Sequence, residues 1–489
     1  MDAPAAPPHD DASEIVLSDS GITVDGVSIS TDDSAAVYMA NDIVYYESGK
    51  DFTYGEGSEK DAHAPEEAAA HTVVHITKPG VYSLSGKLSL GQVAVDLGDG
   101  AKENPEAVAT LVLNGVDITC EVAPAVIFYN VYECGNNGAD TAAKDADTSA
   151  AGANVIIADG TENNISGSYV ERIYKPGSVV LNEEGTEVEE AEKLHKYDGA
   201  FYSKRSMNIF GEKKNTGVLH INAANEGLDS ECHLTINGGN IYIESGNDGI
   251  NTNEDGVSVM TMNGGMLSIK VNGATGEGDG IDSNGWLVIN GGTVIAQACS
   301  NSADAGIDSD MGIHINGGTV LATGNMLDRI EEGGQNYALF PLMQKMNGGE
   351  TVTVKNEKNK QIFETTPENA YSILIYSSPE LKDETYTLWN GETQIASDSD
   401  GMMGGPGMGF GDMERPEPPE GFTPPEGEER PEGFTPPQDG DVPPDGFIPP
   451  EGEAFPEDFT PPADGQPPLR PDGNRPDKLG EPPMDMQKR

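Results

Sequence analysis

One short pattern, repeated four times between residues 227 and 318, constrains the fold of this chain more than any other feature. Each copy reads Gly, then Leu or Ile, then Asp or Asn, then Ser or Thr, and is followed by Asn-Gly-Gly. The Asn-Gly-Gly elements begin at Asn237, Asn263, Asn290 and Asn316, at intervals of 26, 27 and 26 residues. A fixed period of this size is typical of one supersecondary unit that stacks on copies of itself.

Apolar residues recur at alternating positions on both sides of each Asn. One such column holds Leu234, Met260, Leu287 and Ile313. A period of two indicates β-strands with one buried face, and Gly and Asn suit the corners between strands. Three short strands per repeat predict an all-β solenoid, a parallel β-helix, with coils about 4.8 Å apart. A β-propeller is disfavoured because its repeat needs about 40–45 residues.

Composition divides the chain into four predicted parts. Residues 1–13 form a leader rich in Pro, Ala and Asp that we expect to be disordered, and residues 14–349 form the β-helix. Residues 350–399 form a C-terminal β cap over the last coil. Residues 400–489 form a Gly/Met linker and an acidic, disordered Pro-rich tail with repeated Phe-[Thr/Ile]-Pro-Pro. We expect this tail to be an extended stalk, or to contact the cell wall or a partner domain.

The charge of the chain limits its partners. It carries 83 Asp and Glu against 28 Lys and Arg, a net charge of −55. This balance disfavours nucleic acid and anionic lipid and favours divalent cations. No apolar stretch reaches the ~20 residues of a membrane helix, so we expect no membrane insertion. The acidic N-terminus lacks the basic and apolar regions of a signal peptide, and we expect a secreted or cell-surface protein whose signal peptide is not present in this sequence.

Each repeat places an acidic or amide side chain at an equivalent position. The candidate metal ligands are one ladder of Asp229, Asn251, Asp282 and Asp308, a second of Glu226, Asp248, Asp279 and Asp304, and Asp198 from a degenerate earlier coil. Two carboxylates ~5 Å apart repel by about 3 kcal/mol at an effective dielectric near 20, so a row of them favours bound cations. Calcium suits such a site because it takes about six to eight oxygen ligands. The alternative is that these residues form turns by bonding their own backbone.

Four aromatic or imidazole side chains are candidates for sugar contact. Trp286 takes the position that His233 holds in a sister coil, and both are expected to face outward. Tyr242 and His314 occupy outward positions on neighbouring strands. Rings with an apolar body and a polar edge suit sugar binding. The alternative for Trp286 is structural cover beneath a loop.

Catalysis has weaker support in the sequence. A β-helical lyase needs a base, often Lys or Arg, beside a calcium-neutralised uronate carboxylate. Lys204 and Arg205 follow the degenerate coil and could lie near the acidic ladders, but the favoured interpretation is two solvated charges at a turn. A glycosidase needs one defined carboxylate pair, and no pair stands out. No catalytic residue is assigned.

Further segments carry a likeness to a known family. They are residues 76–86, 111–119, 198–204 and 376–379, together with the repeats. On the basis of these segments and the repeats, residues 22–388 resemble the calcium-bearing, carbohydrate-binding right-handed parallel β-helix proteins of clostridia and their relatives. The resemblance implies a polysaccharide-lyase-like fold without established lyase activity, bound calcium, and extracellular binding of cellulose-like or acidic plant polysaccharide. The sequence departs from the repeat at Asn251, which precedes an insertion, and at Asp304, which is shifted by one residue.

The sequence therefore predicts an extracellular, calcium-dependent polysaccharide-binding protein without catalysis. Calcium would bridge this acidic surface to an acidic polysaccharide that it would otherwise repel. Two alternatives stay open, a calcium-dependent polysaccharide lyase and a structural or adhesive cell-surface protein.

Overall fold

The computed structural model describes residues 3–399 and shows an all-β chain. In this range the helical elements are limited to α1 (Pro65–Ala69) and the 3-10 turn η1 (Ala101–Glu103). No helix among the described residues has the length and apolar character needed to cross a membrane. The prediction of an all-β fold is confirmed.

Most strands belong to two large sheets. Sheet A has 19 strands: β1 (Ser13–Leu17), β2 (Thr23–Val24), β3 (Val27–Ser28), β6 (Gly80–Leu88), β8 (Ala109–Thr119), β10 (Ala153–Ile157), β11 (Glu162–Gly167), β17 (Met207–Gly211), β18 (Val218–Ala223), β20 (Leu234–Ile236), β21 (Asn240–Ser245), β23 (Val259–Met262), β24 (Met266–Val271), β26 (Trp286–Ile289), β27 (Thr293–Gln297), β28 (Gly312–Ile315), β29 (Thr319–Gly324), β30 (Tyr337–Met346) and β33 (Tyr371–Ser377). Sheet B has eight, in the order β25 (Ile281–Ser283), β22 (Ile250–Thr252), β19 (Glu226–Ser230), β16 (Gly199–Ser203), β9 (Val126–Asn130), β7 (Gly91–Asp96), β5 (Thr72–Ile76) and β4 (Val37–Ala40).

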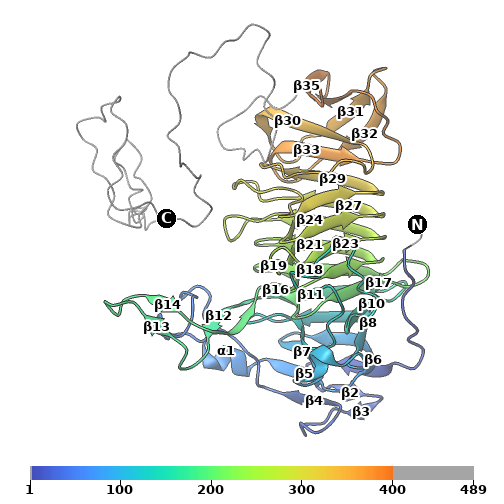
Figure 1. Cartoon of the computed structure of the whole chain (residues 1–489). Helices are drawn as coiled ribbons and strands as arrows, with labels where there is room; N and C mark the ends of the chain where they lie inside the picture. The colour runs from blue at the N-terminus through green and yellow to red at the C-terminus, as the bar shows by residue number, and fades with distance from the viewer. Residues whose placement is uncertain (1–2, 400–489) are drawn as a thin grey trace, which may run out of the picture. The chain divides into compact units, whose positions relative to one another are not determined.

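Equivalent strands of successive repeats pair in parallel. One ladder in sheet A runs from β8 through β10, β17, β20, β23 and β26 to β28. A second runs from β11 through β18, β21, β24 and β27 to β29. In sheet B, β9, β16, β19, β22 and β25 pair in the same way. Figure 1 shows these strands stacked one above another. A full repeat thus contributes three strands, as its sequence predicts.

The predicted apolar columns form the core between the sheets. Leu234, Met260, Leu287 and Ile313 are in register on neighbouring strands and are fully buried. The Leu or Ile of each Gly-[Leu/Ile]-[Asp/Asn] element is buried as well. Burying a side chain of this size stabilises the fold by roughly 1.5–3 kcal/mol. The inward positions were therefore predicted correctly.

The Asn-Gly-Gly elements form the same corner in each sequence repeat. Asn263 donates to the Asn237 side-chain oxygen at 2.9 Å, and the next two Asn residues continue this amide ladder at 2.9 and 2.8 Å. The second glycine of each element has a positive φ, between 81° and 95°. A residue with a Cβ rarely adopts this conformation, so the corner needs Gly. The motif recurs because each sequence repeat makes the same turn.

Antiparallel strand pairs are found at the two ends of the parallel ladders. β1 pairs with β2, β4 with β5, and β29 with β33 in this sense. A four-stranded antiparallel sheet contains β32 (Gln361–Thr365), β31 (Val352–Asn356), β34 (Tyr386–Asn390) and β35 (Thr393–Ser397). The large sheets are therefore mixed and open, which the repeats did not predict. The right-handed winding and the four domain boundaries stay predictions, and the tail at 400–489 lies outside the described residues.

Two segments flank the stacked strands. The insertion between β11 and β16 holds two hairpins, one of β12 (Val170–Tyr174) with β15 (Lys193–Tyr197) and one of β13 (Val180–Leu181) with β14 (Val188–Glu190). Figure 1 shows this insertion projecting to one side of the stack, while the N-terminal segment runs along the other. These two segments bring residues from outside the repeats to the surfaces described below.

Candidate metal centre

The register of sheet B aligns the first acidic ladder. Asp229 on β19 pairs with Asn251 on β22, which pairs with Asp282 on β25. An isolated parallel bridge between Ile281 and Ile307 continues the stacking toward Asp308. The side chains that the sequence predicts to lie in one column do lie on neighbouring strands.

Three carboxyl groups meet at one end of this ladder. Oxygens of Asp198, Glu226 and Asp229 lie within 4.8 Å of one another, and all three residues are buried. Asp198 immediately precedes β16, and the other two are on the neighbouring strand β19. A Cβ atom at Gly199 would lie 2.5 Å from Asp229 Cβ, so this position has no room for a side chain. We call these three residues the carboxyl cluster, a group that could hold a metal ion.

Two oxygens of the cluster, and one of the neighbouring Asn251, have no hydrogen-bond donor among the described residues. Asn251 Nδ2 donates to Glu226 Oε1 at 3.1 Å, and Asn253 Nδ2 donates to Asp229 Oδ1 at 2.8 Å. Glu226 Oε2, Asp229 Oδ2 and Asn251 Oδ1 are buried without a partner. Buried polar atoms are nearly always satisfied, so three unsatisfied oxygens at one place fit a bound cation. The donor set is entirely oxygen, which suits a hard ion.

Burial and mutual repulsion perturb these groups. Burial, together with neighbouring carboxyl groups, raises the pKa of Glu226 and that of Asp229 well above the usual range. Burial also raises the pKa of Asp198, while Lys196 opposes that shift. Lys196 Nζ lies 2.8 Å from Asp198 Oδ2. Three carboxylates against one ammonium leave an excess of negative charge that a divalent ion would balance.

The ammonium of Lys196 is held in its charged form. Burial lowers its pKa, but the charges of Asp198 and then of Glu226 and Asp229 raise it more, and the pKa ends above its ordinary value. Lys196 comes from β15 of the insertion, a segment without repeat character. The sequence offered Lys204 and Arg205 as candidate basic neighbours of the ladders, with solvated charges at a turn as the favoured interpretation. The structure puts Lys196, which the sequence analysis did not consider, in contact with the cluster.

Side chains of the second ladder form hydrogen bonds between successive sequence repeats. Asp248 Oδ1 accepts from the Asp279 backbone N–H at 2.6 Å, and Asp279 Oδ1 accepts from Ala305 N–H at 2.5 Å. Asp304 Oδ2 accepts from Gly278 N–H at 2.6 Å. The turn-forming interpretation requires bonds from each side chain to its own local backbone, whereas these bonds join neighbouring repeats. Burial raises the pKa of Asp248 to about 7 and that of Asp279 to about 9.

Asp282 and Asp308 belong to a separate acidic group further along the stack. Burial, then the charges of Asp310 and Asp328, raise the pKa of Asp282 to about 6. Burial, then Asp328 and Asp282, raise the pKa of Asp308 to about 7. Asp328 Oδ2 accepts from the Ser309 N–H at 3.0 Å. Sequence reasoning missed Asp310 and Asp328 because neither stands at the aligned position of the repeat.

The candidate sugar-binding residues lie on sheet A and are separate from the carboxyl cluster on sheet B. Trp286 on β26, Tyr242 on β21 and His314 on β28 are partly exposed. Tyr242 stacks on His220 with ring centroids 5.2 Å apart. Their predicted contact with sugar stays a prediction.

The structure contradicts the prediction that the His233 side chain faces outward. Its side chain is fully buried, and Nδ1 accepts a hydrogen bond from the Val259 N–H at 3.1 Å. Burial lowers its pKa to about 4, so the ring is neutral at pH 7. The prediction that His233 faces solvent is wrong, because the loop after β9 brings Asn136 against the ring. A ring in this position cannot contact a sugar at the surface.

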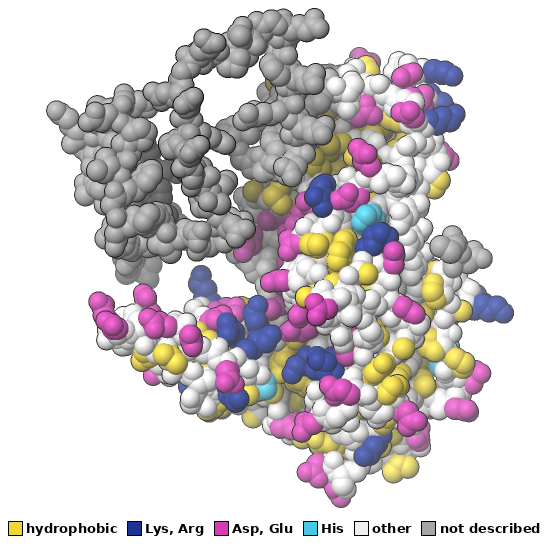
Figure 2. Space-filling view, in the orientation of Figure 1, with side chains coloured by type: hydrophobic (Ala, Val, Ile, Leu, Met, Phe, Trp, Pro, Cys, Tyr) yellow, Lys and Arg dark blue, Asp and Glu magenta, His cyan; other side chains and the backbone are white. Residues whose placement is uncertain are grey.

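A pocket lined in part by β15 contains residues that the repeats did not reveal. It has a volume of 330 Å³, and its lining includes His75, Tyr129, His195, Tyr197 and Lys204. These residues come from β5, β9, β15 and the end of β16, so no local pattern unites them. Figure 2 shows Lys and Arg side chains gathered where the insertion meets the stacked strands. Tyr197 directly precedes the cluster residue Asp198 in the sequence, but no residue of the carboxyl cluster lines the pocket.

Parts of this chain are similar to known proteins. A family model described as carbohydrate-binding domain-containing protein matches residues 70–145 and 146–358. A carbohydrate-binding domain-containing protein of Acetivibrio thermocellus is 30% identical over 174 residues, which are 35% of this chain and 45% of the relative. The match thus spans less than half the length of that relative. The solved gadolinium derivative of a polysaccharide lyase-like protein from C. thermocellum aligns with 66% of this chain and 98% of its own, at 21% identity and a TM-score of 0.34.

Proposed function

This chain belongs to the family of carbohydrate-binding domain-containing proteins, and on that premise we propose that it binds polysaccharide through a calcium ion held by its carboxyl cluster. The family match extends over more than half of the chain. The observation that carries the calcium proposal is the meeting of three buried carboxyl groups whose oxygens lie within 4.8 Å of one another.

Calcium fits this donor set better than zinc does. Asp198, Glu226 and Asp229 supply carboxylate oxygens, and Asn251 supplies an amide oxygen without a donor. Calcium takes about six to eight such ligands, including water, whereas zinc prefers Cys and His, which the cluster lacks. When bound, the ion supplies positive charge that attracts the carboxylates of an acidic polysaccharide. This matters for a chain whose net charge is −55.

The finer features of the sequence prediction belong to the same proposal. The three parallel ladders support coils of a right-handed parallel β-helix. We place the protein outside the cell or on its surface, where polysaccharide is available. The Pro-rich tail would then serve as a stalk or a contact with the cell wall.

Binding is favoured over lyase chemistry by the state of Lys196. A lyase base must accept a proton from the substrate. Lys196 is the basic residue in contact with the cluster, and the surrounding carboxylates raise its pKa. An ammonium held in its charged form cannot act as that base at neutral pH. Its contact with Asp198 instead makes it a fixed countercharge.

The test compares polysaccharide binding with and without calcium. The full chain, freed of metal, is titrated with calcium by calorimetry, and its binding to polygalacturonate is measured in calcium and in excess EDTA. We expect calcium binding by the wild type, loss of polygalacturonate binding in EDTA, and loss of both in Glu226→Gln. Asp117→Asn is the matched control, because Asp117 is an exposed carboxylate paired with Lys87 and outside the cluster. Undiminished binding in EDTA would contradict the proposal.

A further inference from the structure

Among the described residues, a single cation lies within ion-pair distance of the carboxyl cluster, and it approaches from the solvent side. Lys196 Nζ lies 2.8 Å from Asp198 Oδ2, and 40% of the lysine side chain is exposed against 12% of the aspartate side chain. The other two members, Glu226 and Asp229, are 5% and 0% exposed. The ammonium therefore covers the most exposed of the three carboxyl groups.

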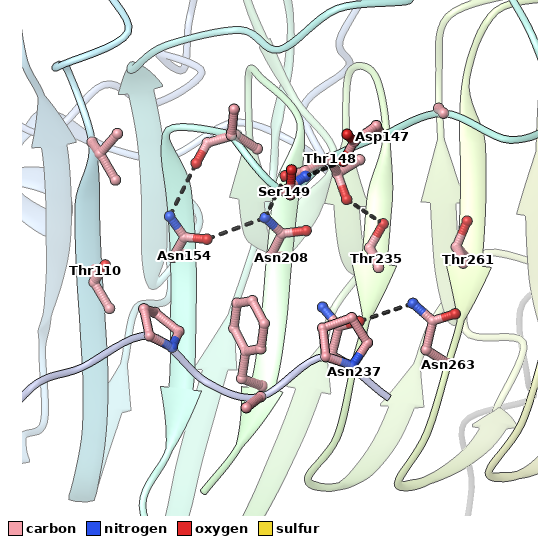
Figure 3. A pocket seen from close by; sticks show the side chains of 18 of the residues that line it. Thr110, Asp147, Thr148, Ser149, Asn154, Asn208, Thr235, Asn237, Thr261 and Asn263 are labelled. Atoms are coloured by element: carbon pink, nitrogen blue, oxygen red, sulfur yellow. Dashed lines mark hydrogen bonds between the residues drawn. The ribbon is translucent and has the colours of Figure 1, made fainter. Parts of the chain in front are cut away.

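Neutral polar side chains elsewhere in the stack bond to one another. Asn208 Nδ2, on the outward face of sheet A, donates to Asn154 Oδ1 at 3.1 Å, and Figure 3 shows neighbouring side chains linked in the same way. Such a network needs no charge from another segment. In the carboxyl cluster, by contrast, Glu226 Oε2 and Asp229 Oδ2 lack a donor among the described residues. The cluster therefore depends on a positive charge that comes from outside the ladders.

The position of this positive charge is less constrained than its presence. Lys196 lies on β15 of the insertion, which pairs with β12 in an antiparallel hairpin whose register shifts at two points. Its ammonium stands at the end of a flexible four-carbon stem, and the side chain is partly exposed. The ammonium can therefore leave Asp198 by rotation about side-chain bonds, without any change in the backbone. The charge of Lys196 is fixed, whereas its position is not.

An ammonium and a calcium ion would compete for the same oxygens. A lysine ammonium has one positive charge and three hydrogen-bond donors, whereas calcium has two charges and takes about six to eight oxygen ligands. Both cations are attracted by the carboxylates, and at short range they repel one another. Asp198 is the shared partner, because the carboxyl group that pairs with Lys196 also belongs to the cluster. Calcium binding is therefore expected to displace the ammonium.

We propose that Lys196 is a tethered competitor of calcium, which neutralises part of the carboxyl cluster while no ion is bound and turns to solvent when calcium binds. This inference rests on the proposed calcium site and adds a regulation to it. The tethered ammonium stabilises the calcium-free cluster and lowers its affinity for the ion. It thereby sets the calcium concentration at which the cluster fills.

Calorimetric titration of the full chain with calcium at constant pH tests the competition. Lys196→Met keeps the apolar stem and removes the charge. A partly exposed ion pair contributes up to about a fivefold factor, and this ammonium serves three carboxylates, so the variant should bind calcium about tenfold more tightly than the wild type. Lys193→Met is the matched control, because Lys193 lies on the same strand with 44% of its side chain exposed and pairs with Glu231, outside the cluster, at 3.2 Å. Its calcium affinity should stay within about twofold of the wild type.

Two further readouts do not rely on the calcium affinity. In EDTA, Lys196→Met should unfold at a lower urea concentration than the wild type, because the cluster loses its countercharge, and saturating calcium should remove that difference. Acetylation of the wild type by N-hydroxysuccinimide acetate, followed by mass spectrometry, should modify Lys196 faster in calcium than in EDTA. Lys193 should be modified at the same rate in both.

The outcomes separate this inference from the calcium site itself. If the wild type binds calcium but Lys196→Met binds it no more tightly, or if calcium does not speed the acetylation of Lys196, the inference is wrong and the calcium site stands. Weaker calcium binding by Lys196→Met would show that the ammonium orients Asp198 for the ion, which also overturns the inference. If neither protein binds calcium, the proposed calcium site is wrong and the inference falls with it. Calcium binding by Lys196→Met alone would support the competition and contradict the site proposed for the wild type.

Discussion

Replacing Asp229 by Asn should stabilise the calcium-free protein and abolish its response to calcium. Asn has nearly the same shape as Asp, and its side-chain oxygen can keep the bond from Asn253 Nδ2, which is 2.8 Å long in the wild type. Its amide N–H can also donate to the unsatisfied oxygen of Glu226. The substitution therefore removes one negative charge from the carboxyl cluster without creating a cavity.

The size of the effect follows from the geometry of the cluster. At the 4.8 Å limit of their oxygen separation and an effective dielectric of about 20, two carboxylates repel by about 3.5 kcal/mol. Asp229 makes two such pairs, and Lys196 offsets part of this repulsion. Protonation limits the destabilisation that the charge of Asp229 can cause, because Asp229 can become neutral instead. Keeping an ordinary Asp neutral at pH 7 costs about 4 kcal/mol. Asp229→Asn should therefore raise the free energy of unfolding by up to about 4 kcal/mol in EDTA.

The same reasoning fixes the direction of the pH dependence. Burial and the charge of Asp198 raise the pKa of Asp229 in the folded state. The folded protein therefore holds this proton more tightly than the unfolded chain does. The resulting stability is fully present below the unfolded pKa, near 3.9, and is lost as the pH rises through the folded pKa. In EDTA the advantage of Asp229→Asn should vanish near pH 4 and grow toward pH 8.

Urea unfolding followed by tryptophan fluorescence measures these differences. It is run from pH 4 to pH 8 in EDTA and in calcium, with Asp117→Asn as the control for loss of an exposed carboxylate. Calcium should stabilise the wild type and the control and leave Asp229→Asn unaffected. A less stable Asp229→Asn in EDTA at pH 7, or equal stabilisation of both proteins by calcium, would refute the reasoning.

Two other predictions concern the core. Ile250→Ala truncates a fully buried side chain and should lower the free energy of unfolding, measured in urea, by about 2–5 kcal/mol. If Ile250→Ala lowered the free energy of unfolding less than Ile250→Val does, the buried packing of Ile250 would be contradicted. The buried, neutral ring of His233 has its pKa lowered to about 4, so stability should be complete above about pH 6.5 and fall by about 3 kcal/mol toward pH 4. His233→Asn should flatten that part of the stability profile, and an unchanged profile would show that His233 is not its source.

The repeats allowed much of the fold to be predicted. Alternation of apolar residues is a local property of a strand, and a constant period brings equivalent residues together whatever lies outside the repeat. The register of Leu234 with Met260 and of Asp229 with Asn251 follows from these two facts alone. The antiparallel strands at the ends of the stack have no such period, and the mixed sheets were not anticipated.

The candidate sites were predicted less completely, because they depend on segments that pack from a distance. Lys196 reaches the carboxyl cluster from the insertion, and Ala6 covers Phe210 from the N-terminal segment. His233 stands at an outward position by alternation, yet the loop after β9 buries it. A pattern assigns the faces of a strand but carries no information on which face another segment will cover.

By itself, the sequence determined that its acidic side chains would form columns, since stacking repeats places them one above another. Only the tertiary structure decided which of them bond to the backbone of a neighbouring repeat and which kept unsatisfied oxygens. Asp279 bonds to the backbone of the next coil, whereas Asp229 and Glu226 face each other beside a single ammonium. That difference arises from hydrogen-bond geometry and burial, which depend on how neighbouring coils and the insertion meet in space.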